Sequence, residues 1–205
     1  MMRNPSGMRA LIAVLVLLST CVVAAVDDPQ ALVRQTADKV LAEVSSRKAE
    51  LEADPRLIYP LVESTVLPHF DFRAMSQSAL GRFWRDASDA QKEKVTEEFR
   101  ELLVRTYATA LLGYSGQQIE YLPVQIPPDA EQVLIPTRIA SSGAPPVPIN
   151  YRLKRDDARW LVFDVVIDGV SLITNYRSQF TGLVRRGGID GLITALAEKN
   201  RGTTP

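Results

Sequence analysis

The stretch Trp160-Leu161-Val162-Phe163-Asp164-Val165-Val166-Ile167 is the part of the sequence that decides the fold. It is apolar at every position except Asp164, and it is rich in the β-branched and aromatic residues that favour strands. A strand with one face in water would alternate polar and apolar residues, whereas this run is continuous. We therefore predict a strand that is buried on both faces and lies at the centre of a sheet.

Two further strands are predicted upstream of this run. In each of them the apolar and β-branched residues occupy every second position, which is the period of a strand with one buried face. Residues 141–146 between them read SSGAPP, a composition typical of a turn, so we expect the two strands to pair antiparallel. The alternating positions are Val133, Ile135, Thr137 and Ile139, then Val147, Ile149, Tyr151 and Leu153.

The region before the strands has the signals of helices. Asp28-Pro29 and Asp54-Pro55 each place a capping acid before a proline that suits the first helical turn. Ser88 and Gln91 form a capping-box pattern in front of the longest apolar stripe at helical spacing, which continues to residue 111. A shorter helix is expected over residues 72–80.

The helical pattern returns after Gly169 and is interrupted at Gly187-Gly188. Helices and antiparallel strands thus occur in separate runs, which predicts the α+β class. No linker divides the chain, so we expect a single domain over residues 26–200 with a polar tail over residues 201–205.

The first 25 residues are predicted to be a secretory signal peptide. Arg3 and Arg9 precede the uncharged residues 10–26, which end in small side chains, and we expect cleavage after Ala25. The apolar part is shorter than the about 20 residues that a membrane-spanning helix needs. An alternative is a lipoprotein in which Cys21 is acylated, although Thr20 is a poor residue before such a cysteine.

Charge and cysteine content exclude several classes of protein. The chain has 24 basic and 24 acidic residues, and removal of the signal peptide would leave a formal charge of −2, which does not suggest polyanion binding. Cys21 is the only cysteine and would be removed as well, so core burial rather than disulfides must stabilise the mature protein.

Six blocks of the sequence carry a family resemblance. They are Gly81-Arg82-Phe83-Trp84, residues 99–107 (FRELLVRTY), 160–164 (WLVFD), 169–172 (GVSL), 175–177 (NYR) and 179–180 (QF). In these blocks and in their order the chain resembles the MlaC family of periplasmic phospholipid-binding proteins, also called toluene-tolerance proteins. The resemblance covers about residues 30–200.

The resemblance implies a fold and a function. The expected fold is a curved antiparallel sheet of about four strands, similar to the nuclear-transport-factor cone, with helices around it and an apolar cavity between them. The expected function is that of a periplasmic carrier that moves a phospholipid between membranes and maintains outer-membrane lipid asymmetry. It also implies two partners, an inner-membrane MCE-protein and ABC-transporter complex and an outer-membrane lipoprotein associated with a porin, and no cofactor.

A lipid carrier needs a large apolar cavity. Burial of a methylene contributes about 0.8 kcal/mol, so a lipid with roughly thirty of them resists leaving a bilayer by on the order of 20 kcal/mol. We therefore expect a cavity of about 1,000 Å³. Our candidates for its wall are Leu103, Tyr107, Leu111, Ile135, Ile149, Tyr151, Val162, Val170, Ser171 and Ile173.

The phosphate of such a lipid is expected at the mouth of the cavity, because a charged group is costly to desolvate. The donors Arg82, Ser171 and Arg177 are our candidates for binding it. Most of the binding free energy would then come from methylenes that all diacyl lipids share, which predicts little selectivity between headgroups.

Two other classes of function stay open at this point. In an enzyme with the same architecture, Asp164 could abstract a proton with Tyr107 as a hydrogen-bond donor, but a structural role for Asp164 near Gly169 is the simpler interpretation. His69 is the only histidine and has no neighbouring ligand at metal-binding spacing. The third class is a periplasmic interaction protein that presents an apolar patch and encloses no ligand.

Overall fold

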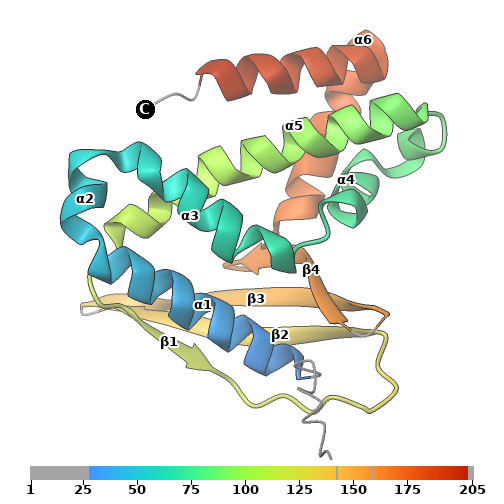
Figure 1. Cartoon of the computed structure of the whole chain (residues 1–205). Helices are drawn as coiled ribbons and strands as arrows, with labels where there is room; N and C mark the ends of the chain where they lie inside the picture. Colours follow the sequence, from blue (N-terminus) through green and yellow to red (C-terminus); the bar gives the residue numbers. More distant parts are fainter. Residues whose placement is uncertain (1–27, 142, 158, 203–205) are drawn as a thin grey trace, which may run out of the picture.

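The computed structural model describes residues 28–141, 143–157 and 159–202, and the predicted signal peptide and Cys21 lie outside them. Figure 1 shows helices stacked over one face of an open sheet. The helical elements are α1 (Pro29–Ser46), α2 (Lys48–Ala53), η1 (Pro55–Leu57), α3 (Ile58–Thr65), η2 (Leu67–His69), α4 (Phe72–Leu80), η3 (Gly81–Trp84), α5 (Asp89–Tyr107), η4 (Ala108–Gly113) and α6 (Leu172–Gly202). The strands are β1 (Gln118–Tyr121), β2 (Gln132–Ser141), β3 (Ala144–Asp156), β4 (Arg159–Ile167) and β5 (Val170–Ser171).

The strands form one antiparallel sheet in the order β1-β2-β3-β4-β5. The predicted α+β class is confirmed, and the sheet has five strands where about four were expected. The count differs because β1 and β5 are short, with four and two residues, so neither shows a period-two pattern long enough to read in the sequence.

The helices begin where the capping signals predict. The carboxylate of Asp28 accepts hydrogen bonds from the backbone N–H groups of Gln30 and Ala31 at 2.8 and 3.2 Å. Ser88 and Gln91 form the reciprocal capping box that starts α5. Helix α2 was not predicted, because its sequence KAELEA contains a single buried residue.

The prediction that β4 lies at the centre of the sheet was wrong. Strand β3 occupies the middle, and β4 lies one place from the edge. The continuous apolar run is nevertheless buried, because Phe70 forms a bridge with Val162 along the free edge of β4, and α4 and α6 contact the strand. Helices and not neighbouring strands bury β4, which explains why its sequence is continuously apolar although the strand is not central.

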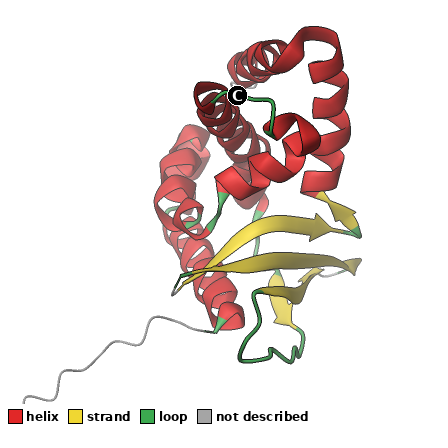
Figure 2. Cartoon of the chain, turned by 90° about the vertical axis from the view of Figure 1, so that its right-hand side faces the viewer, coloured by secondary structure: helices red, strands yellow, loops and turns green. Residues whose placement is uncertain are grey.

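Three groups of buried side chains hold the molecule together. One lies among α4, η3, α5 and α6, the second joins α1 to α2, α3 and η4, and the third lies between α1 and the sheet. Figure 2 shows the helices gathered to one side and one end of the sheet. Helix α6 turns sharply at Gly188, which has φ 66° and ψ −170°, a conformation that only glycine adopts readily, and this confirms the predicted break. Within the described residues, every helix is too short or too polar to cross a membrane.

Candidate functional site

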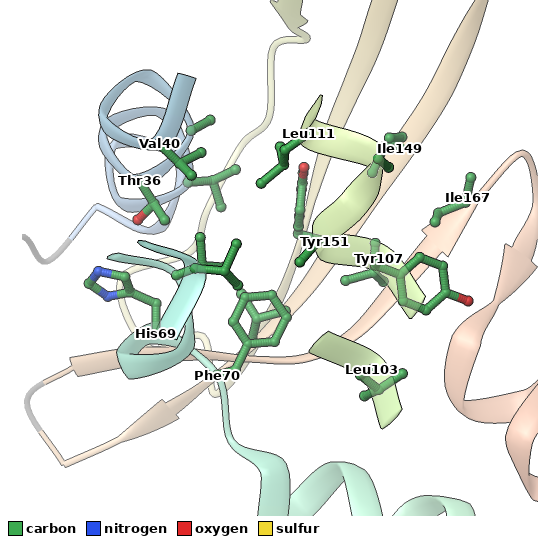
Figure 3. Close-up of a pocket in the computed structure, with 18 of the residues that line it drawn as sticks. Thr36, Val40, His69, Phe70, Leu103, Tyr107, Leu111, Ile149, Tyr151 and Ile167 are labelled. Atoms are coloured by element: carbon green, nitrogen blue, oxygen red, sulfur yellow. The ribbon is translucent and has the colours of Figure 1, made fainter. Parts of the chain in front are cut away.

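A cavity of about 510 Å³ lies between the inner face of the sheet and the helices α1, α3 and α5 with η4. It is about half the expected size and falls within the ordinary range of ligand sites. Large side chains such as Phe70, Tyr107 and Tyr151 occupy part of the space between the layers, and Figure 3 shows them around the cavity.

The sheet contributes one wall of this cavity. Ile149 and Tyr151 are two residues apart on β3, so both point to the same face of the sheet. On β4 the register shifts opposite Arg152 and Leu153, and Phe163 is the extra residue. A bulge of this kind changes the face to which side chains point. As a result Val162 faces the cavity, and Phe163 packs against the helical core.

The helices contribute the opposite walls. Thr36 and Val40 lie one turn apart on α1, and Leu103 and Tyr107 lie one turn apart at the end of α5. Leu111 in η4 faces the same space, and Figure 3 shows it beside Tyr151. Leu103, Tyr107 and Leu111 belong to the apolar stripe that the helical spacing predicted, and they face a cavity that close packing would otherwise have filled.

The wall of the cavity carries no formal charge at neutral pH. Across the described residues that line it, none is Asp, Glu, Lys or Arg. Burial, with a smaller contribution from Tyr121, raises the pKa of the Tyr151 phenol to about 12, so this hydroxyl stays neutral. Burial, assisted by the positive charge of Lys39, lowers the pKa of His69, which favours the neutral imidazole. The site can therefore hold a hydrocarbon, and it offers a charged ligand group no counterion.

The structure brings six of the ten candidate wall residues to the cavity. These six are Leu103, Tyr107, Leu111, Ile149, Tyr151 and Val162. The other four lie elsewhere. Ile135 and Ile173 are buried in packed cores, Val170 is 59% exposed on β5, and the hydroxyl of Ser171 donates to Asp164. Ile135 was chosen for its alternating spacing and the other three for their place in or beside the family motif, and neither criterion distinguishes a filled core from a hollow one.

The two arginines proposed for the headgroup also lie outside the cavity wall. Arg177 donates from Nε to the backbone oxygen of Ser78 at 2.8 Å. The guanidinium of Arg82 lies 4.9 Å from the centre of the Phe83 ring. Both side chains are exposed, and neither residue lines the cavity.

Several lining residues were not predicted as site residues. Thr36, Val40, His69, Phe70 and Ile167 all line the cavity, and Figure 3 labels them. The sequence predicts a helix that starts after Asp28, but it does not show that this helix lies across the sheet. His69 and Phe70 come from the short connection between α3 and α4, which has no periodicity to read.

Asp164 is buried away from the cavity wall and holds the start of α6. Its carboxylate accepts hydrogen bonds from the Ser171 hydroxyl at 2.7 Å and from the Ile173 backbone N–H at 3.2 Å, and Arg152 lies 3.4 Å away. A carboxylate near a helix N-terminus is stabilised by the backbone donors there. Among the described residues there is also no group of three or more His, Cys, Asp or Glu that could hold a metal ion.

Comparison with known proteins places this fold and cavity in context. The family model described as "MlaC protein" matches residues 34–198. A binding protein of an intermembrane phospholipid transport system, MlaC of Haemophilus influenzae, is 27% identical over 173 residues, which cover 83% of this chain and 81% of the relative. Toluene tolerance protein ttg2D of Pseudomonas putida is 25% identical over 185 residues, covering 90% and 84% of the two chains.

A solved structure is also similar. It is a phospholipid-binding protein from Ralstonia solanacearum in complex with a phospholipid. The two chains are 32% identical with a TM-score of 0.80, and the match covers 86% of this chain and 98% of the other.

Proposed function

Because the chain belongs to the MlaC protein family, whose model spans residues 34–198, we propose that it is a phospholipid carrier that encloses acyl chains in the cavity under α1. The observation that carries the proposal is the uncharged apolar wall, which faces an open space of about 510 Å³. The phospholipid complex of the similar Ralstonia solanacearum protein supports the same ligand class.

The size of the cavity bears on how much lipid it holds. At roughly 30 Å³ for a group the size of a water molecule, about 510 Å³ has room for about one acyl chain. Burying the roughly sixteen methylenes of one chain contributes about 13 kcal/mol, which balances a similar loss on leaving the bilayer. A lipid with two chains needs about twice this room, so the cavity has to widen before it can enclose both chains.

The headgroup stays at the surface. The described cavity wall contains no cation, and a phosphate drawn inside would be desolvated without a partner. Affinity therefore comes from the tails, and lipids that differ only in headgroup bind with similar affinity. Strong preference for one headgroup among lipids with identical tails would contradict the proposal that the tails supply most of the affinity.

The wider role follows from the carrier proposal. We place the protein in the periplasm, exported by the predicted signal peptide, where it passes lipid between an outer-membrane lipoprotein–porin complex and an inner-membrane MCE-protein and ABC-transporter complex. The name of the Haemophilus influenzae relative, a binding protein of an intermembrane phospholipid transport system, supports a role in phospholipid transport. Any step that consumes ATP belongs to the partner, because a carrier only equilibrates lipid with its acceptors.

The enzyme and scaffold alternatives have less support. Asp164, the strongest candidate for a general base, is engaged by Ser171 and Ile173 and does not line the cavity. A scaffold without a ligand has no use for a hollow interior, because an unfilled apolar cavity costs stability.

Mass spectrometry of an organic extract of the folded protein tests the proposal. We expect phospholipid at close to one molecule per chain, with mixed headgroups. An extract without lipid, from protein that also fails to take up phospholipid from vesicles, would point to the enzyme or the scaffold instead.

A further inference from the structure

Six arginines are concentrated in two stretches that contain no acidic residue. Residues 72–85 contain Arg73, Arg82 and Arg85, residues 172–187 contain Arg177, Arg185 and Arg186, and neither stretch has an Asp or Glu. The chain as a whole has equal numbers of basic and acidic residues. Asp71 and Asp86 lie directly outside the first stretch, so the excess of positive charge is confined to these two segments.

The fold brings the two segments together. Helix α4 and the turn η3 pack against the first half of α6, as Figure 1 shows. Arg177 reaches from α6 to Ser78 on α4, and the Arg73 guanidinium lies 5.4 Å from the centre of the Trp84 ring. Arg82 and Arg85 lie on either side of Trp84 in the chain. We call Arg73, Arg82, Arg85 and Arg177 the arginine face.

The charges of the arginine face are not neutralised within the molecule. All four side chains are exposed, and none of them has a carboxylate within 4 Å in the described part of the chain. Other arginines are paired, such as Arg47 with Glu50 at 2.8 Å. A set of adjacent unpaired guanidinium groups repels itself, and it is stabilised when an anionic surface supplies the missing counterions.

The arginine face borders the proposed lipid site. Phe72 and Met75 of α4 and Leu172 of α6 line the cavity, and Arg73 lies between the first two in the sequence. Resting on the proposed carrier function, we propose that the arginine face docks the protein on the surface of an anionic phospholipid bilayer, with the α4 side of the cavity turned toward the membrane.

A membrane fits this face better than an acidic protein. Guanidinium groups bind phosphate oxygens through paired N–H donors, and a bilayer presents such phosphates at high density. Stable protein interfaces have an apolar centre, whereas the large exposed apolar side chains of the described chain, Leu134, Val147 and Val170, are on strands and not in the two arginine segments. The docking is therefore electrostatic and does not insert side chains into the bilayer.

Co-sedimentation with vesicles tests the docking. Each basic residue near an anionic surface raises the partition coefficient about fivefold, which corresponds to about 1 kcal/mol. The triple variant Arg73→Gln, Arg82→Gln, Arg85→Gln is expected to bind vesicles with 30 mol% phosphatidylglycerol about 100-fold more weakly than the unaltered protein. Binding should also disappear in 0.5 M salt and on purely zwitterionic vesicles.

A matched triple variant tests whether vesicle binding depends on the arginine face or only on the net charge of the protein. Arg34, Lys39 and Arg138 are also exposed and have no carboxylate within 4 Å, but they lie on α1 and β2. Replacing all three by Gln removes the same charge and should change vesicle binding by less than fivefold. If the first triple variant is unstable, Arg85→Gln alone should weaken binding about fivefold, and within the described residues the exposed Arg85 side chain has no hydrogen bond or ion pair to lose.

Two results would overturn the docking proposal. One is that the unaltered protein ignores anionic vesicles at low salt, which would leave an acidic protein as the partner of the face. The other is an equal loss of binding in both triple variants. Lipid content of each variant, measured in an organic extract, keeps this test separate from the carrier function: protein that docks but contains no lipid contradicts the carrier and not the docking.

Discussion

A charge placed on the cavity wall should abolish lipid binding without unfolding the protein. Ile149 is a suitable position, because its side chain faces the cavity from β3 and its backbone oxygen accepts a hydrogen bond from Thr137 at 2.6 Å, which Ile149→Glu leaves in place. No cation lines the described cavity wall to pair with the new carboxylate. In the lipid-free protein the carboxylate can keep water in the cavity. The free-energy cost of desolvating the carboxylate therefore arises only when lipid binds.

The size of the effect follows from desolvation. Removing water from an unpaired carboxylate costs at least about 3 kcal/mol, either directly or as the free energy of taking up a proton. A loss of this size weakens lipid binding by more than about 100-fold. Binding should recover partly as the pH falls and the introduced carboxyl becomes neutral.

Phosphorus content of the purified protein and displacement of a fluorescent phospholipid measure the effect. Leu134→Glu is the matched control, because Leu134 lies on β2 and is 42% exposed outside the cavity wall. It should keep normal lipid content. A folded Ile149→Glu protein that binds lipid as tightly as Leu134→Glu does would refute the placement of the acyl chains.

Other substitutions test the fold around the site. Burial raises the pKa of the Asp71 carboxyl, but hydrogen bonds from Lys154, 2.6 Å away, and from the start of α4 lower it by more, so the net pKa lies below its usual value. The ionised carboxylate therefore stabilises the fold above about pH 4, and this stabilisation is lost as the pH falls through the lowered pKa. Denaturant titrations should show that Asp71→Asn costs about 2 kcal/mol at pH 7 and removes that part of the acid dependence. Gly188→Ala should lower the free energy of unfolding by about 1–3 kcal/mol because of its backbone conformation alone, since no atom lies within 4 Å of an added Cβ. Asp164→Asn should lower the free energy of unfolding by about 2 kcal/mol, and with it the melting temperature, because Ser171 loses a charged acceptor. Phospholipid measured per folded chain should stay unchanged.

The elements of this fold could largely be predicted because their signals are local. Asp28 and the pair Ser88 and Gln91 fix helix starts through hydrogen bonds to backbone groups at most three residues away. The alternation around Ile149 predicts a strand and the face to which each side chain points. Each of these signals spans few residues, and in this fold the local preference agrees with the tertiary contacts.

The cavity could be predicted only in part, because hollowness is a tertiary property. Ile135 and Tyr151 are directly paired across β2 and β3 and point to the same side, yet Ile135 is fully buried and Tyr151 lines the cavity. The position of α1 over the sheet decides which of the two is covered. The bulge turns Val162 toward the cavity and Phe163 toward the helical core. Both residues are apolar, so the sequence of β4 shows no pattern that reveals the bulge.

The position of the acyl chains can be measured directly with a phospholipid that carries a diazirine at the end of one chain. After loading and irradiation, peptide mass spectrometry identifies the labelled residues. The cavity account predicts labels on the wall, among them Leu111, Ile149 and Tyr151, and none on the exposed Leu134. Labels confined to Leu134, Val147 or Val170 would show that lipid binds outside the molecule and would contradict a carrier with an enclosed site.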